Sequence, residues 1–78
     1  MKNTNEIADC VRRTLNRYFR DLDGEMPTAI YDMVLKNVEH SMLEVVMNQA
    51  KGNQTIAAEM LGINRNTLRR KLSEYRLL

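Results

Sequence analysis

The sequence predicts an all-α fold with four helices per chain, and three observations support this. Apolar residues recur every three or four positions along most of the chain, which is the spacing of an amphipathic helix. The only proline and the three glycines of the sequence interrupt this pattern at three places: Gly24 with Pro27, Gly52 and Gly62. The composition, 44% hydrophobic and 28% charged, fits neither a disordered tail nor a membrane span.

The length of the chain limits the number of domains and the stability of a monomer. The 78 residues predict one domain, residues 1–78, and a chain this short is marginal as a monomer because much of its surface stays exposed. Cys10 and His40 are the only cysteine and histidine, so they exclude an intrachain disulfide and cannot complete a four-ligand metal site. Oligomerisation is the remaining way to gain stability. The lone thiol, and the lack of any apolar run near ~20 residues, predict a cytoplasmic protein without a membrane partner.

The first helix is predicted over residues 6–22. Its apolar residues share one face of the cylinder, so this helix is amphipathic. They are Ile7, Val11, Leu15, Tyr18, Phe19 and Leu22.

The second helix is predicted over residues 27–50. Pro27 suits a first helical position, and Gly52 follows where a left-handed residue commonly ends a helix. Such a helix is ~36 Å long at ~1.5 Å per residue. Its apolar residues cover a wide arc, so it needs partners on more than one side. The first helix supplies one partner, and a second copy of the chain is the simplest other, although the C-terminal helices could also cover that side. The arc comprises Ile30, Tyr31, Val34, Leu35, Val38, Met42, Leu43, Val45, Val46 and Met47.

The last two helices are predicted over residues 54–61 and 65–75. They are short and joined by three residues, Gly62 to Asn64, and Asn53 and Asn64 can cap them. Two short helices joined by a tight turn containing glycine are typical of a helix-turn-helix.

Side-chain size supports this motif. Ala58 is small where the helices would cross, Gly62 tolerates a positive φ, and Leu68 lies where the last helix must face inward. The predicted core also includes Met60, Leu61, Ile63, Leu72 and Tyr75.

The charges are unevenly distributed along the chain. Residues 1–20 carry a net charge of +3, residues 21–50 carry −5 and residues 51–78 carry +4, although the whole chain carries only +2. A basic end beside an acidic middle favours a segment that binds a polyanion. A solvated charged surface is the plainer alternative.

Polar residues of the last helix predict contacts with DNA. With Leu68 facing inward, helical geometry at ~100° per residue turns Asn66, Arg69, Arg70 and Ser73 outward. Recognition helices contact bases with their first residues, so Arg65 is the candidate for a guanine. Arg69 reaches a base or a phosphate, and Asn64 bonds a base or acts only as the cap.

The remaining candidates contact the phosphate backbone. Two basic residues and a threonine of the last helix fall in this class, and so does the polar start of the third helix, where exposed N–H groups suit an anion. The set is Asn53, Gln54, Thr55, Thr67, Arg70 and Lys71.

Two stretches, LNRYFRDLDGE and KGNQTIAAEMLGINRNTLRRKL, closely resemble the Fis family of bacterial DNA-bending proteins, and the similarity extends over roughly residues 8–76. The resemblance implies a homodimer whose first two helices interlock (residues 1–50) and whose helix-turn-helix (residues 51–78) binds double-stranded DNA. It also implies a nucleoid-associated transcription regulator that bends DNA, because its recognition helices lie closer together than one turn of straight DNA. The chain starts later than the Fis pattern, which implies a form lacking the N-terminal β-hairpin arm.

The resemblance also assigns residues. Asn64, Arg65 and Arg69 match base-proximal positions of the family, whereas Asn53, Thr55, Thr67, Arg70 and Lys71 match backbone contacts. Lys51 and Gly52 match a turn that touches RNA polymerase. The alternative function is a helical dimer that serves as a protein-interaction module without DNA. An enzyme is not expected, because the sequence contains no catalytic set and implies no cofactor.

Overall fold

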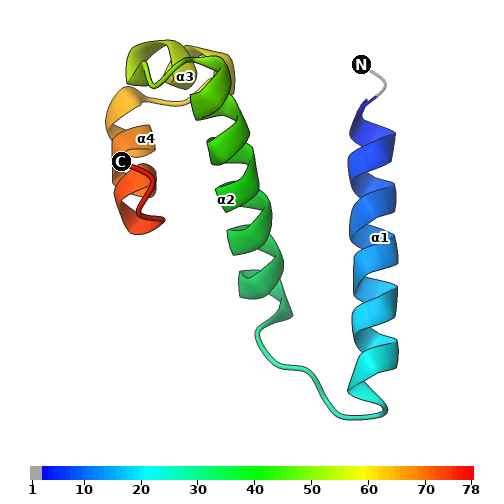
Figure 1. Ribbon diagram of the computed structural model, residues 1–78. Helices are drawn as coiled ribbons and strands as arrows, with labels where there is room; N and C mark the ends of the chain where they lie inside the picture. The colour runs from blue at the N-terminus through cyan, green and yellow to red at the C-terminus, as the bar shows by residue number, and fades with distance from the viewer. Residues whose placement is uncertain (1–2) are drawn as a thin grey trace. The chain divides into compact units, whose positions relative to one another are not determined.

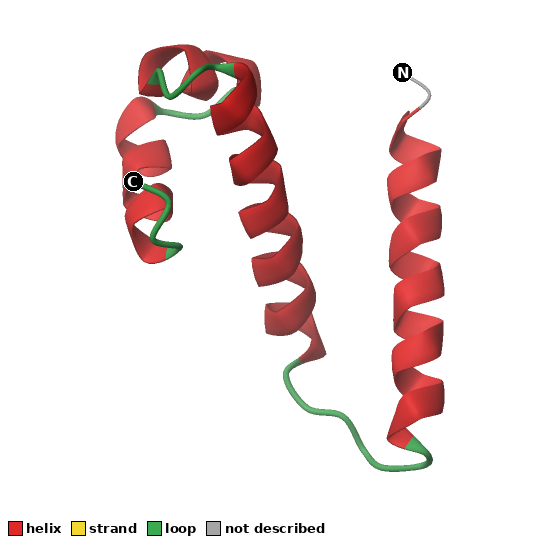
Figure 2. Cartoon of the chain, viewed as in Figure 1, coloured by secondary structure: helices red, strands yellow, loops and turns green. Residues whose placement is uncertain are grey.

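The protein is built from four α-helices in the computed structural model, which describes residues 3–78 and the side chains of residues 5–78. The helices are α1 (Asn3–Leu22), α2 (Ile30–Gln49), α3 (Gln54–Leu61) and α4 (Arg65–Glu74), shown in Figure 1. Every described residue lies in a helix or a loop (Figure 2), so the all-α prediction is confirmed. The chain divides into two compact units, Met1–Ile30 and Tyr31–Leu78. Across the described residues, none of the helices has the length and apolar character needed to span a bilayer.

The first unit consists of α1 and the turn that follows it. The helix ends at Leu22, as predicted, because Asp23 and Gly24 both adopt positive φ (52° and 89°) and end the helical conformation. Ile7 and Phe19 remain at least half-exposed on the apolar face of α1. The helix therefore presents apolar surface to the solvent.

The start of α2 differs from the prediction. The expected start at Pro27 is wrong by three residues, because α2 begins at Ile30. Ala29 has a φ of 58°, which lies in the left-handed region, so the right-handed helix can only begin after it. Pro27 belongs to the connecting loop rather than to the first turn of α2.

The end of α2 is a left-handed stop. Lys51 and Gly52 adopt φ values of 54° and 81°. The N–H of Lys51 donates to the carbonyl of Asn48 (3.1 Å), and the N–H of Gly52 donates to the carbonyl of Met47 (3.0 Å). These two bonds form a Schellman motif, which satisfies carbonyls that the last turn leaves without helical partners. The expected glycine stop is confirmed, with Lys51 as its first left-handed residue.

The turn between α3 and α4 is also capped at both sides, as predicted. Asn53 accepts the N–H of Ile56 at the start of α3 (3.1 Å), and Asn64 accepts the N–H of Asn66 at the start of α4 (2.7 Å). Gly62 has a φ of 74° and closes α3 through bonds to the carbonyls of Ala58 and Glu59. Local hydrogen bonds therefore define this helix-turn-helix.

One small core joins α2, α3 and α4. Its buried members are Leu43, Ala50, Ala57, Ala58, Leu68 and Leu72. Leu61, Ile63 and Tyr75 pack against it, as the sequence predicted. Met60 does not: its side chain is 53% exposed, because the small Ala57 and Ala58 occupy the buried side of α3. The core thus includes the second half of α2, which supports the helix-turn-helix.

Candidate nucleic-acid interface

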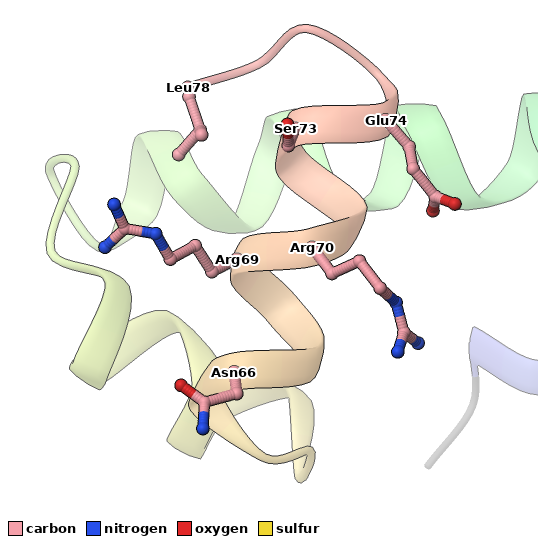
Figure 3. A pocket seen from close by; sticks show the side chains of 6 residues that line it. All are labelled: Asn66, Arg69, Arg70, Ser73, Glu74 and Leu78. Carbon is pink, nitrogen blue, oxygen red and sulfur yellow. The ribbon is translucent and has the colours of Figure 1, made fainter.

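The orientation of α4 is set by its two fully buried leucines. Leu68 and Leu72 have no exposed surface, so the opposite side of the helix faces the solvent. That side forms a shallow hollow, lined by Asn66, Arg69, Arg70, Ser73, Glu74 and Leu78 (Figure 3). The arginines at 69 and 70 project from different sides of the helix in this view. The predicted outward face is therefore present, with two guanidinium groups on it.

Arg65 begins α4 and is exposed. Its guanidinium donates a long hydrogen bond (3.4 Å) to the hydroxyl of Thr55, one residue after the start of α3. This contact brings one predicted base-reading residue and one predicted backbone-contacting residue together from two helices.

Asn64 acts as the N-cap of α4, where its side-chain oxygen accepts the N–H of Asn66. The sequence left a base contact and a capping role open for this residue, and the structure shows the cap. The side-chain NH₂ group is the part of Asn64 that could still donate to a base edge. Asn53 has the same role at the start of α3.

The other predicted backbone contacts differ in exposure. Thr55 and Arg70 are exposed, whereas Gln54 and Thr67 are half-buried. Lys51 and Gly52, the candidate polymerase contact, form the exposed turn after α2.

Lys71, also predicted to contact the DNA backbone, instead forms an ion pair with Glu39 of α2. Its ammonium lies 2.8 Å from one carboxylate oxygen of Glu39 in α2, and the hydroxyl of Tyr75 donates to the other oxygen at 2.7 Å. The hydrogen bonds from Lys71 and Tyr75 hold the pKa of Glu39 below its ordinary value. The hydrogen bond to Glu39, together with burial, raises the pKa of Tyr75 to about 12. Both shifts favour the bonded arrangement at neutral pH.

No group of three or more His, Cys, Asp or Glu side chains that could hold a metal ion occurs in the part of the chain that the structure describes. The chemistry available at this surface is that of guanidinium, amide and hydroxyl groups. Such groups suit a phosphate backbone and base edges.

Comparison with known proteins identifies the family. The family model described as "Bacterial regulatory protein, Fis family" matches residues 34–75. The chain is 55% identical over 74 residues to a Fis-like DNA-binding protein of Ralstonia nicotianae, which covers 95% of this chain and 96% of that protein. The chain belongs to the Fis family. The DNA-binding protein Fis of Glaesserella parasuis is 54% identical over 69 residues, or 88% of this chain and 70% of that relative.

A further Fis-like DNA-binding protein, from Neisseria meningitidis serogroup A, is 52% identical over 73 residues, covering 94% of this chain and 92% of that protein. The segment that matches the Fis family model contains α3, α4 and most of α2. The resemblance stated from the sequence is therefore confirmed.

Glu39 is the residue of this Fis-family unit that sequence reasoning missed. A signal was present, because Glu39 lies four residues before the buried Leu43 and so on the side of α2 that faces the core. An acidic residue at such a position calls for a partner, and Lys71 and Tyr75 supply it.

Proposed function

We propose that this Fis-family protein is a homodimeric, sequence-tolerant DNA-binding and DNA-bending protein that acts as a nucleoid-associated transcription regulator in the bacterial cytoplasm. The observation that carries the proposal is the fixed orientation of α4: Leu68 and Leu72 are fully buried, and Arg69 and Arg70 line the exposed hollow. The names of the relatives agree, since they are DNA-binding proteins.

Base reading is assigned to the start of α4. Arg65 has the fork of donors that matches guanine O6 and N7, and Arg69 lies about one turn further along the helix. Asn64 contributes its NH₂ group while it caps the helix. The expected effect is a preference for particular bases at few positions, which is consistent with weak sequence specificity.

Positioning on the phosphate backbone is assigned to residues around these readers. Asn53, Gln54 and Thr55 stand at the start of α3, where backbone N–H groups and short polar side chains suit a phosphate. Thr67 and Arg70 extend this set along α4. Such contacts fix register and give affinity without reading sequence.

The homodimer part of the proposal is supported by uncovered apolar surface on α2. Leu35, Val38, Met42 and Val45 are between 43% and 61% exposed, and helical geometry places them on one face. An apolar face this long is usually an interaction site. A second copy of the chain would bury it and would supply the second recognition helix.

DNA bending follows from the dimer that the family resemblance implies. If two recognition helices lie closer together than one turn of straight DNA, about 34 Å, the duplex must bend to admit both. Sequence preference then depends partly on how readily the DNA deforms at positions that the protein does not touch.

The turn at Lys51 and Gly52 is proposed as the contact with RNA polymerase. Both residues are exposed, so the turn at the end of α2 is accessible to a partner. The assignment rests on the family motif. Lys51→Ala should reduce activation of transcription in a purified system while leaving duplex affinity nearly unchanged.

The test of DNA reading is Arg65→Ala, measured by fluorescence anisotropy on a preferred site and on random duplex. The preferred site should lose about 1–3 kcal/mol of binding free energy, and the difference between the two duplexes should shrink. Arg12→Ala is the matched control, because it removes the same charge from the exposed surface of α1. A gel-shift phasing assay on the same duplexes reports the bend.

The alternative function makes a different prediction. If the parent protein forms a dimer but binds no duplex at low salt, the proposed DNA reading fails. That result would favour the helical protein-interaction module.

A further inference from the structure

Glu39 connects α2 to the recognition helix α4 through two hydrogen bonds. One carboxylate oxygen bonds Lys71 (2.8 Å) and the other bonds Tyr75 (2.7 Å), so both oxygens are used by residues one helical turn apart. The ring of His40, also in α2, contacts Tyr75 edge to face at a centroid distance of 5.5 Å. The second half of α4 is therefore fixed to α2 by specific polar contacts as well as by the apolar core.

Lys71 is on a different side of α4 from the two exposed arginines. At ~100° per residue, Lys71 and Tyr75 lie on one side of the buried direction of Leu68 and Leu72, Arg69 lies on the other side, and Arg70 points opposite to it. The surface hollows agree with this geometry. The arginines line the outward hollow of Figure 3, and Lys71 lines a groove with Leu35, Val38 and Met42 of α2.

We propose that Glu39 is a positioning residue for DNA binding: it holds α4 at a fixed angle to α2 through Lys71 and Tyr75, and it keeps Lys71 away from the phosphate backbone. This inference rests on the proposed DNA-binding function. Lys71 is a structural partner of Glu39, whereas the family motif alone would make it a phosphate contact. The outward residues of α4 then meet the duplex in an orientation set by a carboxylate on another helix.

The connection is tested first in the protein without DNA. Glu39→Gln and Lys71→Met should each lower the thermal midpoint of unfolding. Because both remove the same contact, the midpoint of the double variant should be no lower than that of the less stable single variant. Lys71→Arg preserves the charge, so its thermal midpoint should be close to that of the parent protein. Fully additive losses would overturn the connection between Glu39 and Lys71.

The effect on DNA is tested by the salt dependence of binding to random duplex. Arg70→Met should reduce the slope of log affinity against log salt by about 1.8, because a dimer loses two phosphate contacts at about 0.9 each. Lys71→Met should leave the slope at the parent value, because Lys71 neutralises no phosphate. Arg70 is a matched control, since it is the adjacent cation on the same helix.

Positioning has a separate signature in sequence preference. Lys71→Met and Glu39→Gln should both lower the ratio of preferred-site to random-duplex affinity, and Lys71→Arg should restore it. A slope that falls as much in Lys71→Met as in Arg70→Met would overturn the inference, because Lys71 would then be a phosphate contact. If Lys71→Met disturbs folding, as judged by circular dichroism, Lys71→Gln replaces it.

The outcomes separate the two proposals. A parent protein that binds no duplex refutes the proposed function, and the unfolding experiment then decides the role of Glu39 without DNA. A parent that binds duplex, with additive midpoint losses, refutes only the role of Glu39.

Discussion

Val38→Glu tests whether the apolar face of α2 is buried in a dimer. Val38 is 43% exposed in the single chain, so a carboxylate there would stay in contact with water and change the free energy of unfolding by no more than about 0.5 kcal/mol. In a dimer the same carboxylate would be buried without a partner. That costs about 3–5 kcal/mol per subunit, in addition to about 1 kcal/mol of lost apolar burial.

Because a symmetric dimer contains the substitution twice, the total destabilisation of the dimer is of order 8–12 kcal/mol. This is comparable to the entire stability of a small domain, so the variant should fail to dimerise. Because a chain of 78 residues is marginal as a monomer, the separated subunits should then fail to fold. Sedimentation equilibrium gives the mass, and circular dichroism at two protein concentrations gives the folded fraction.

Asn37→Glu is the matched control, because Asn37 lies on the exposed polar stripe of α2 with Ser41, Glu44 and Asn48. It adds the same charge one residue away and should leave mass and folding unchanged. A Val38→Glu protein that is monomeric and as stable as the parent would refute the dimer argument.

Three further predictions concern the helix-turn-helix. Leu68→Ala removes a fully buried side chain and should lower the free energy of unfolding by about 2–5 kcal/mol, measured by urea denaturation. Gly62→Ala should cost about 1–2 kcal/mol, since its added Cβ meets no atom within 4 Å and only the φ of 74° is strained; thermal unfolding would show this. The Glu39–Tyr75 contact should stabilise the fold between pH 4.5 and 10, and weaken as pH falls through the lowered pKa of Glu39 or rises through about 12, measured by unfolding across pH. A pH-independent stability above pH 10 in the parent would contradict the last of these.

The elements that local sequence signals define were predicted well. Asn53, Gly62 and Asn64 form caps and turns through bonds within a few residues, so their roles follow from residue type alone. The start of α2 was missed because a left-handed alanine at position 29 has no recognisable signal, whereas Pro27 has a strong one. Glu39 was missed for a different reason, since its contacts with Lys71 and Tyr75 join residues more than thirty positions apart.

The pairing of Lys71 also changes how the positive charge of the C-terminal segment should be counted. Residues 51–78 contain six basic side chains, yet one of them is bonded to Glu39 of α2, and Arg76 lies beyond the end of α4. Arg65, Arg69 and Arg70 then remain on the side of α4 assigned to DNA. A dimer would place six such arginines on a duplex, so the salt slope would reach about −5 only if every one of them neutralised a phosphate. A measured slope much steeper than this would mean that cations outside α4, such as Lys51, also meet the backbone, and that the contact surface extends to the turn after α2.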